Sequence, residues 1–338
     1  MLKGAIVGIG KIAQTGHLPA YLSDQIRNRA EVIAAVDPSE QSRGIAAERY
    51  PSLRLYENVE QLFRNEKINF IDICATPQVH GQIINAAVRQ RKHILCEKPF
   101  ALSLKEAEGL SRQLREEKSL VFVPCHQYRF SPLWQHMKSF LSKGRSGDKW
   151  FLQFNVFRKE ADPGLHVDGP AWRTKPDISG GGMIADTGVH YLYLSLWMMG
   201  MPYSVTARGY QLRGAGHAVE DTAFVVLESA KGVTQINLTR GADRRANSAH
   251  LLGKDGSISY TGGSLVQHWH DAKETIPVPD ASDKSLYVSL YVSLIDEFIN
   301  SIEKRKSTAA WIEEGYQTVK LLDACYTSVK EGRTITID

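Results

Sequence analysis

The stretch "ILCEKPF", residues 94–100, carries an apolar run directly into a carboxylate, Glu97, an amine, Lys98, and a proline, Pro99. The proline stiffens the backbone at this point. Two interpretations are open: the ordinary tip of a strand that reaches solvent, or a placed pair of chemical groups. The residue types alone do not separate them, so the neighbouring sequence has to.

A second group of residues has the spacing of a phosphate-binding turn. "AIVGIGKIA" contains Gly8, Gly10 and Ala13 in the pattern G-x-G-x-x-A, after an apolar run and before a helix-like segment. Gly8 permits the tight turn, Gly10 lets a pyrophosphate approach the backbone, and Ala13 lets helix and strand pack closely. The helix start, with Lys11 and Ile12, then presents backbone N–H groups to the anion.

A carboxylate stands where such a turn requires one. The run "EVIAAVD" ends at Asp37, at the spacing where an acid can hydrogen-bond a ribose 2′-hydroxyl. Asp37 would repel a 2′-phosphate, which favours NAD over NADP. Ser39, Ser42 and Arg43 lie close enough in sequence to keep NADP open. The alternative is a tight strand–helix turn with an incidental acid.

The elements that position these groups are strands and helices in alternation. Over residues 1–124 the apolar runs are continuous, as expected for strands covered on both faces, and helix-like segments separate them. This pattern predicts βαβ units with a parallel sheet, in which ligands bind at the carboxyl ends of the strands. The runs are "GAIVGIG", "VIAAVD", "FIDICAT", "HILCEKP" and "LVFVPC".

Residues 125–338 have a different texture. After a helix near 131–143, strand-like stretches with polar alternation follow one another across glycine-bearing turns, which indicates an antiparallel sheet. Two helices, near 285–304 and 311–331, and a short strand close the chain. Both faces of "KWFLQFNVF" hold apolar residues. We therefore expect helices on one face of an open sheet and, on the other, a second subunit of a homodimer or homotetramer.

The composition is that of an ordinary globular protein. Of 338 residues, 43% are hydrophobic and 23% charged, and 41 Lys plus Arg against 37 Asp plus Glu give a formal net charge of +4. This small excess argues against a dedicated nucleic-acid or membrane-surface protein. The four cysteines form no CxxC pair, and three of them lie at the ends of apolar strand-like runs, where we expect small buried side chains. This usage predicts a reducing, cytoplasmic compartment.

Four motifs together resemble the Gfo/Idh/MocA family of NAD(P)-dependent oxidoreductases, the glucose–fructose oxidoreductase and inositol dehydrogenase relatives. They are "VGIGKIAQTGHLPA", "TPQVHGQIINAA", "ILCEKPFALSLKEAE" and "SGGGMIADTGVHYL". The resemblance implies an α/β Rossmann domain, residues 1–124, followed by an α+β domain with a large open, mostly antiparallel sheet, residues 125–338. It also implies a sugar, cyclitol or related polyol as substrate.

The resemblance assigns roles to residues at matching positions. Lys98 matches the catalytic lysine, Glu97 the acid near the nicotinamide ribose, and Asp186 and His190 the acid and histidine that face the substrate carbon. The loop beside the nicotinamide matches Thr76, Pro77 and His80, and the segment bordering the substrate matches Trp172 and Arg173.

The sequence departs from the family pattern at two places. Gln127 stands where an asparagine is common before an arginine, and Tyr193 replaces an aspartate three residues after the motif histidine. These departures leave the substrate open. Hydroxyl or carboxylate contacts are available from Tyr128, Arg129, Arg158, Arg173 and Lys175.

Dehydrogenation of a secondary alcohol needs a base for the hydroxyl proton and an acceptor for the hydride. Lys98 at a strand end is suited to be that base, because burial and nearby charge can draw a lysine towards neutrality. Asp186 and His190 are four residues apart, one turn of a helix that we expect to begin near residue 186. There Asp186 could hold His190 or the lysine, or simply cap the helix. We expect Gly180 to Gly182 to let the chain approach the cofactor.

A metal site is an alternative interpretation for two pairs of residues. Asp186 and His190 have a spacing that suits a metal, but no third ligand stands out. His268 and His270, which we place on one face of a strand, more often reflect sheet packing, and His166 and Asp168 lie in a glycine- and proline-bearing loop. No metal is expected.

Three functions remain in competition. The first is an NAD(P)-dependent dehydrogenase or reductase acting on a CH–OH group of a sugar or cyclitol. The second is a dinucleotide sensor without turnover, which would have no need for Lys98, Asp186 and His190 together. The third is a hydrolase or lyase that holds NAD permanently and oxidises and re-reduces its substrate within one cycle.

Overall fold

The computed structural model describes residues 1–159, 172–213, 218–281 and 283–337. The described residues form two compact units, one of 1–127 and 287–316, the other of 128–159, 172–286 and 317–337. No helix within the described ranges is both long and apolar enough to cross a membrane.

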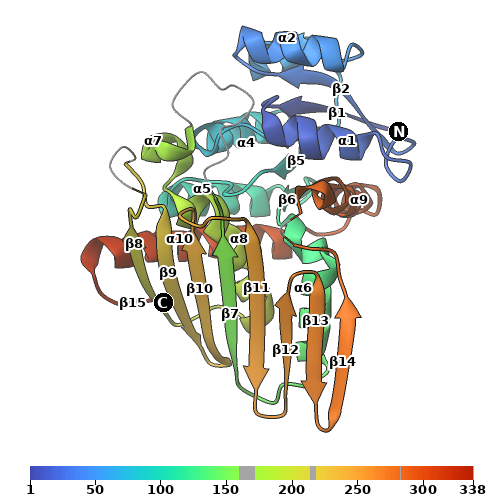
Figure 1. Cartoon of the computed structure of the whole chain (residues 1–338). Coiled ribbons are helices and arrows are strands. Elements are labelled where there is room, and N and C mark those ends of the chain that lie inside the picture. The colour runs from blue at the N-terminus through green and yellow to red at the C-terminus, as the bar shows by residue number, and fades with distance from the viewer. Residues whose placement is uncertain (160–171, 214–217, 282, 338) are drawn as a thin grey trace. The chain divides into compact units, whose positions relative to one another are not determined.

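The first unit is built on a parallel sheet with the strand order β3-β2-β1-β4-β5-β6 (Figure 1). This is the order of a dinucleotide-binding Rossmann fold, so the predicted fold of the N-terminal half is confirmed. The strands are β1 (Leu2–Val7), β2 (Ala30–Val36), β3 (Arg54–Tyr56), β4 (Phe70–Ile73), β5 (His93–Cys96) and β6 (Phe122–Pro124).

Serine caps mark the start of two of the helices between these strands. Ser39 and Ser103 cap their helices by accepting a hydrogen bond from the backbone N–H three residues on, at 3.2 Å in each case. Strand β3 and helix α3 escaped prediction because they are short and mostly exposed or half-buried. The helices are α1 (Leu18–Tyr21), α2 (Glu40–Arg49), α3 (Val59–Asn65), α4 (His80–Arg89) and α5 (Leu104–Glu116).

Helix α9 (Tyr287–Glu303) packs with this unit although it comes from the far end of the chain. The Arg29 guanidinium holds it through Asp296 at 2.5 Å and Glu303 at 2.6 Å. At Gly16 a Cβ would lie only 2.7 Å from the Tyr291 ring, so the glycine permits the close approach of α9. The compact unit thus includes a segment beyond the predicted boundary at residue 124, and the functional division of the chain stays a prediction.

The second unit is built on an open sheet with the order β14-β13-β12-β11-β7-β10-β9-β8-β15 (Figure 1). All neighbouring strands run antiparallel except β7 and β10, which confirms the predicted, mostly antiparallel sheet. The strands are β7 (Trp150–Phe157), β8 (Ser204–Tyr210), β9 (Thr222–Ser229), β10 (Gly232–Thr239), β11 (Ala246–Gly253), β12 (Gly256–Thr261), β13 (Ser264–Trp269), β14 (Ala272–Pro277) and β15 (Ile335–Thr336).

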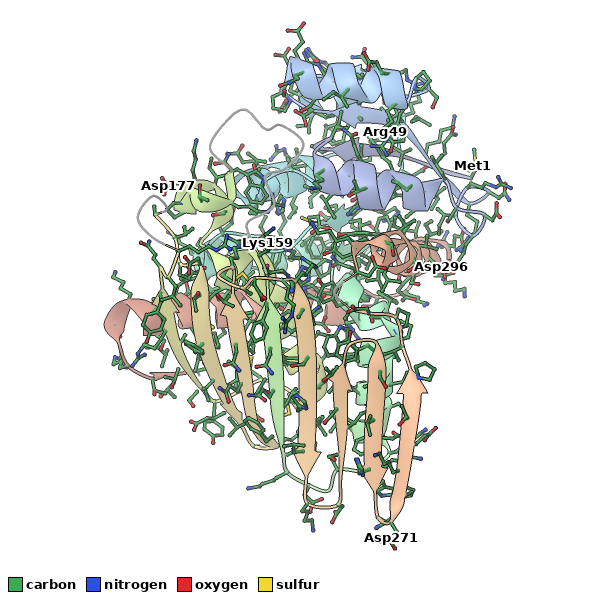
Figure 2. All side chains as sticks on the ribbon, in the orientation of Figure 1. Met1, Arg49, Lys159, Asp177, Asp271 and Asp296 are labelled. Carbon is green, nitrogen blue, oxygen red and sulfur yellow. The ribbon has the colours of Figure 1, made fainter. Side chains whose placement is uncertain are left out.

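The two faces of this sheet differ more than the sequence of β7 indicates. Leu152, Phe154 and Val156 are fully buried, and the sheet contacts α6 (Pro132–Ser142) and α8 (Val189–Met199). On the other face, from which side chains project outward (Figure 2), the Asn237 amide donates to Asn155 at 2.7 Å. On this face the polar row is flanked by exposed apolar side chains, namely Phe157, Tyr210, Phe224 and Leu252.

Candidate active site

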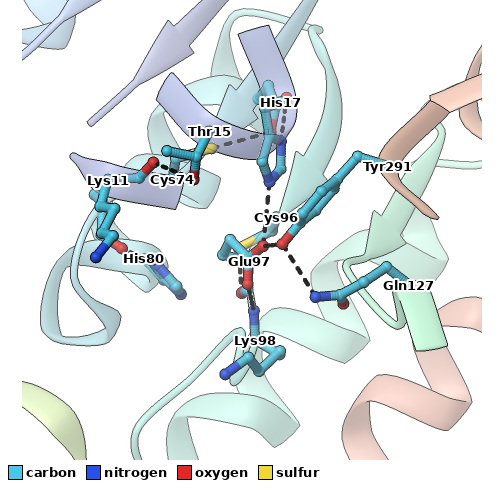
Figure 3. A network of polar contacts seen from close by, with 12 residues as sticks. Lys11, Thr15, His17, Cys74, His80, Cys96, Glu97, Lys98, Gln127 and Tyr291 are labelled. Carbon is cyan, nitrogen blue, oxygen red and sulfur yellow. Dashed lines mark hydrogen bonds and ion pairs between the residues drawn. The ribbon is translucent and has the colours of Figure 1, made fainter. Parts of the chain in front are cut away.

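The Glu97–Lys98 pair is not an ordinary solvent-facing strand tip. Glu97 is only 6% exposed, and Lys98 is half-buried. The Oε1 atom of Glu97 accepts a hydrogen bond from the Tyr291 hydroxyl at 2.5 Å and faces Nε2 of His17 at 3.1 Å (Figure 3). Its Oε2 atom accepts from the backbone N–H of Lys98 at 3.1 Å. Both oxygens are therefore engaged by the protein.

His17 connects Glu97 to a second buried carboxylate. Its Nδ1 lies 2.8 Å from Asp72, which also accepts from the Tyr21 hydroxyl at 3.1 Å. Because both ring nitrogens face carboxylate acceptors, each must carry a proton, so the ring is an imidazolium. The amide of Gln127 extends the network by donating to the Tyr291 hydroxyl at 3.0 Å.

The electrostatics agree with this protonation state. Burial alone would lower the pKa of His17, but the Asp72 carboxylate raises it well above its ordinary value. Burial alone would raise the pKa of Glu97, but the hydrogen bond and charge of His17 bring it down to about 2. Each buried charge is thus stabilised by the opposite charge beside it.

The same cluster has the donor types of a metal site. Donor atoms of His17, Glu97 and Cys125 lie within 4.8 Å of one another. Both nitrogens of His17 already serve carboxylates, however, and burial raises the pKa of the Cys125 thiol, which keeps it protonated. We therefore interpret the cluster as a hydrogen-bonded network. All four cysteines are buried free thiols, which confirms the prediction made for the three that end apolar runs.

The glycine turn fits the pyrophosphate of a dinucleotide. Gly8 has φ +92°, and a Cβ there would lie 2.5 Å from the backbone nitrogen of Ala75, so this position requires glycine. At Gly10 a Cβ would meet nothing within 4 Å, which leaves the space that a phosphate would need. The chain is helical from Lys11, with a π-helical turn at Ala13–His17 that brings His17 into contact with Glu97.

Asp37, the predicted ribose residue, holds the glycine turn. Its Oδ2 accepts from the Ile9 N–H at 2.8 Å and its Oδ1 from the Ser39 N–H at 2.9 Å. An ionised carboxylate has about four acceptor positions, so capacity for ribose hydroxyls is left. The Arg43 guanidinium donates to the Asp37 carbonyl at 2.7 Å.

His80 braces the loop predicted to lie beside the nicotinamide. Thr76 precedes the 3₁₀ turn Pro77–Val79, and the fully buried His80 follows it. Its two ring nitrogens lie 2.9 Å from the Ala75 carbonyl and 2.8 Å from the Pro99 carbonyl. Burial lowers the pKa of His80. The ring therefore ties this loop to the residue that follows Lys98.

The second unit places Asp186 differently from expectation. Asp186 lies in a π-helical turn, Ile184–Gly188, just before α8, and the cap position is Met183. Its carboxylate pairs with Arg173 at 3.2 Å and with the Nη2 of Arg240. The prediction that Asp186 caps the helix is wrong, and the carboxylate instead pairs with two guanidinium groups, one of which, Arg240, carried no sequence signal. The predicted contact of Asp186 with His190 or the lysine stays a prediction.

His190 is brought together with Tyr128. The ring of His190, 7% exposed, stacks on Tyr128 at a centroid distance of 4.3 Å. Its Nδ1 lies 3.1 Å from the Tyr193 hydroxyl, which accepts from the Tyr128 N–H at 3.0 Å. The residue at which the sequence departs from the family pattern, Tyr193, is therefore the one that orients the imidazole.

The other predicted substrate residues stack on aromatic rings. The guanidinium of Arg129 lies 5.1 Å from the centre of the Trp197 ring, and that of Arg173 lies 4.3 Å from the centre of the Trp172 ring. His270 lies beyond the end of β13 with φ +50°, so the prediction that it shares a strand face with His268 is wrong. His166 and Asp168 lie outside the described residues.

Two of the three glycines before Asp186, Gly181 and Gly182, serve the protein's own packing. A Cβ at Gly181 would lie 1.9 Å from the Tyr326 hydroxyl, and one at Gly182 would lie 2.1 Å from the Glu220 carbonyl. Close contact with Tyr326 and Glu220 is therefore one reason for glycine at these two positions, and the expected approach to the cofactor stays a prediction.

Tyr326 and Glu220 also cap the start of the helix that carries Asp186 and His190. The Tyr326 hydroxyl accepts from the Gly182 N–H at 3.0 Å and donates to Glu220 at 2.9 Å. The Glu220 carboxylate accepts from the Ile184 N–H at 2.9 Å. These groups satisfy N–H groups that a helix start otherwise leaves without partners. Sequence reasoning missed both residues.

Known proteins resemble both halves of the chain. A family model described as an oxidoreductase family with an NAD-binding Rossmann fold matches residues 2–124, and one described as the C-terminal alpha/beta domain of the oxidoreductase family matches residues 153–337. D-glucoside 3-dehydrogenase of Escherichia coli K12 is 22% identical, over 99% of this chain and 97% of that protein. Inositol 2-dehydrogenase 2 of Saccharopolyspora erythraea is 27% identical, over 90% and 88%. Levoglucosan dehydrogenase, solved with NADH, shares the fold with a TM-score of 0.85 at 19% identity, over 100% of this chain and 99% of that one.

The buried pair of His17 and Glu97 predicts a pH-dependent contribution to stability. The pKa of Glu97 is depressed from 4.5 to about 2, so its contribution is present above pH 4.5 and is lost as the pH falls towards 2. The pKa of His17 is raised above 6.5, so its contribution is complete below pH 6.5 and is lost as the pH rises through the folded-state value.

We therefore expect His17→Asn to lower the free energy of unfolding most between pH 4.5 and 6.5. Urea unfolding of the wild type and the variant across the pH range measures this difference. A difference that is equally large at pH 5 and pH 9 would contradict the assigned charges.

The packing of Gly182 predicts the cost of a methyl group. Gly182→Ala should lower the free energy of unfolding by more than about 2 kcal/mol, because the new Cβ meets the Glu220 backbone. Gly109→Ala is the control, because Gly109 lies in helix α5 and a Cβ there would meet nothing within 4 Å. This substitution should raise the free energy of unfolding by up to about 1 kcal/mol. Denaturant unfolding of both variants checks the contrast, and equal effects would refute it.

Proposed function

The chain belongs to the Gfo/Idh/MocA family of NAD-binding oxidoreductases, and from that premise we propose which reaction it catalyses. It transfers hydride between NAD and a secondary alcohol or ketone of a sugar, cyclitol or related polyol. Lys98 acts as the acid/base group. The observation that carries the proposal is the Glu97–Lys98 strand end, where a half-buried amine follows a carboxylate fixed by buried donors.

The proton chemistry follows from the groups at this strand end. In the oxidative direction Lys98 takes the proton of the reacting hydroxyl, and in the reductive direction it returns a proton to the forming alkoxide. Bound NAD supplies the hydride acceptor. His190, whose ring is oriented by Tyr193 and stacked on Tyr128, hydrogen-bonds the reacting hydroxyl. Asp186, paired with Arg173, anchors a further substrate hydroxyl.

The cofactor residues follow from the fit of the glycine turn. The open space over Gly10 and the N–H groups of Lys11 and Ile12 take the pyrophosphate. Asp37 takes the ribose hydroxyls and favours NAD, with NADP as the second possibility. The Thr76–Pro77 loop and, through its remaining acceptor capacity, Glu97 border the nicotinamide end.

The substrate class is narrowed by the relatives. Proteins named D-glucoside 3-dehydrogenase, inositol 2-dehydrogenase and D-apiose dehydrogenase resemble this chain over most of its length. A panel of glucosides, inositols and pentoses is therefore the first choice. These names support the polyol class and leave the individual compound to the assay.

Lys98→Ala should lower kcat by at least about a hundredfold on the active polyol, because the acid/base group is lost, and should leave the Kd of NAD within about threefold. The change in nicotinamide absorbance and NAD titration measure the two quantities. Lys118→Ala, at an exposed position of the same unit, is the control and should match the wild type.

Each other outcome has a distinct meaning. Turnover of Lys98→Ala at the parental rate would show that the base is wrongly assigned. NAD binding with no turnover of any polyol would favour a sensor. Retention of tightly bound NAD through purification, with product formed and no net NADH release, would favour a redox-assisted hydrolase or lyase.

The exposed apolar residues on the outer face of the nine-stranded sheet support a homodimer or homotetramer through that face. Phe224 and Leu252 are each 46% exposed there. The double variant Phe224→Glu, Leu252→Glu should reduce the solution mass from two or four chains to one, as light scattering measures. Leu22→Glu, at a 66% exposed position of the other unit, should leave the mass unchanged. A monomeric wild type would refute the proposal.

A further inference from the structure

We propose that His17 and Tyr291 are positioning residues for Lys98 and that they act through the Glu97 carboxylate. The inference rests on the proposed function, in which Lys98 carries the proton. Neither residue stands in the catalytic set assigned above. They set the geometry of the strand end that delivers the lysine.

The contacts form a continuous chain to the lysine backbone. One oxygen of Glu97 is held by the Tyr291 hydroxyl at 2.5 Å and by His17 at 3.1 Å. The other oxygen accepts from the N–H of Lys98 at 3.1 Å. A carboxylate is planar and rigid, so fixing Oε1 from two directions also fixes Oε2. The peptide that carries the Lys98 side chain is therefore oriented by groups on two other elements.

If the network of His17, Asp72 and Glu97 served only to fill the core, its buried charges would be a costly way to do so. Two carboxylates and an imidazolium are buried together, and apolar residues of similar volume often give equal or greater stability at such positions. The ring of Tyr291 also packs on that of His17 with centroids 4.1 Å apart, so the two donors approach Glu97 as one body. Unlike apolar packing, a network of directional hydrogen bonds at this place can fix the orientation of the peptide that carries Lys98.

The network offers a matched comparison between its two carboxylates. Tyr291 donates to Glu97, whereas Tyr21 donates to Asp72 at 3.1 Å, on the far side of His17. Both tyrosines are almost fully buried, at 0% and 3% exposure. Tyr291→Phe and Tyr21→Phe each delete one buried hydroxyl that serves a buried carboxylate, but only the first touches the carboxylate that leads to Lys98.

The experiment compares Tyr291→Phe, Tyr21→Phe and the wild type as full chains with NAD bound. We expect similar shifts in the urea midpoint for both variants. Tyr291→Phe should lower kcat on the active polyol about tenfold or more with little change in KM, because a small displacement of a reacting group is costly. It should also move the backbone amide NMR signal of Lys98. Tyr21→Phe should do neither.

Two results would overturn the inference. One is an unchanged Lys98 amide signal and kcat in Tyr291→Phe, and the other is equal effects of the two variants on both readouts. His17→Gln, which keeps one donor but not the charge, should follow Tyr291→Phe. The Lys98 signal needs no substrate, so it decides the positioning role even if no polyol is turned over and the proposed function fails.

Discussion

A buried imidazolium between two carboxylates is the interaction on which the candidate site depends. His17 would be too costly to bury as a charge without Asp72, and Glu97 would be too costly without His17. Each partner makes the other's ionised state possible. The result is a carboxylate that stays charged at the end of β5 and keeps both its oxygens occupied, so the strand ends in a fixed geometry instead of fraying into solvent.

The second unit follows the same design with different groups. The helix bearing Asp186 and His190 begins at N–H groups that Tyr326 and Glu220 satisfy, and the glycines there let those side chains come close. In both units the reactive candidates stand at the end of a regular element, and polar groups from remote sequence hold that end. Binding groups placed in this way are pre-organised, which lowers the cost of ordering them when substrate arrives.

The sequence predicts the architecture and the motifs formed by residues close in sequence. Continuous apolar runs identified the parallel strands, the glycine pattern identified the cofactor turn, and alternation identified the open sheet. The glycine-rich segment before Asp186 is ambiguous in the sequence, since the same residues suit a cofactor approach or a close protein contact. The protein contact is made by Tyr326 and Glu220, which are distant in sequence, and no local pattern indicates that these residues approach the glycines.

The sequence does contain a sign of the buried pair formed by His17 and Asp72. An aspartate inside the apolar run "FIDICAT" is out of place in a strand buried on both faces, and it needs a buried partner. Tyr291 offered no such sign, because its hydroxyl reaches Glu97 across 194 positions of sequence. Propensity and periodicity report only on residues that are close in sequence, so they cannot predict a contact between residues this far apart.

The position of α9 has a consequence for the order in which the protein takes shape during synthesis. Residues 1–127 are synthesised long before Tyr291. Arg29 likewise precedes its partner Glu303 by 274 positions. Until then the charged cluster at His17 lacks the helix that covers it. Contacts of such long separation form late and slow the last stage of folding. The N-terminal compact unit is therefore complete only after residues 287–316 have been synthesised.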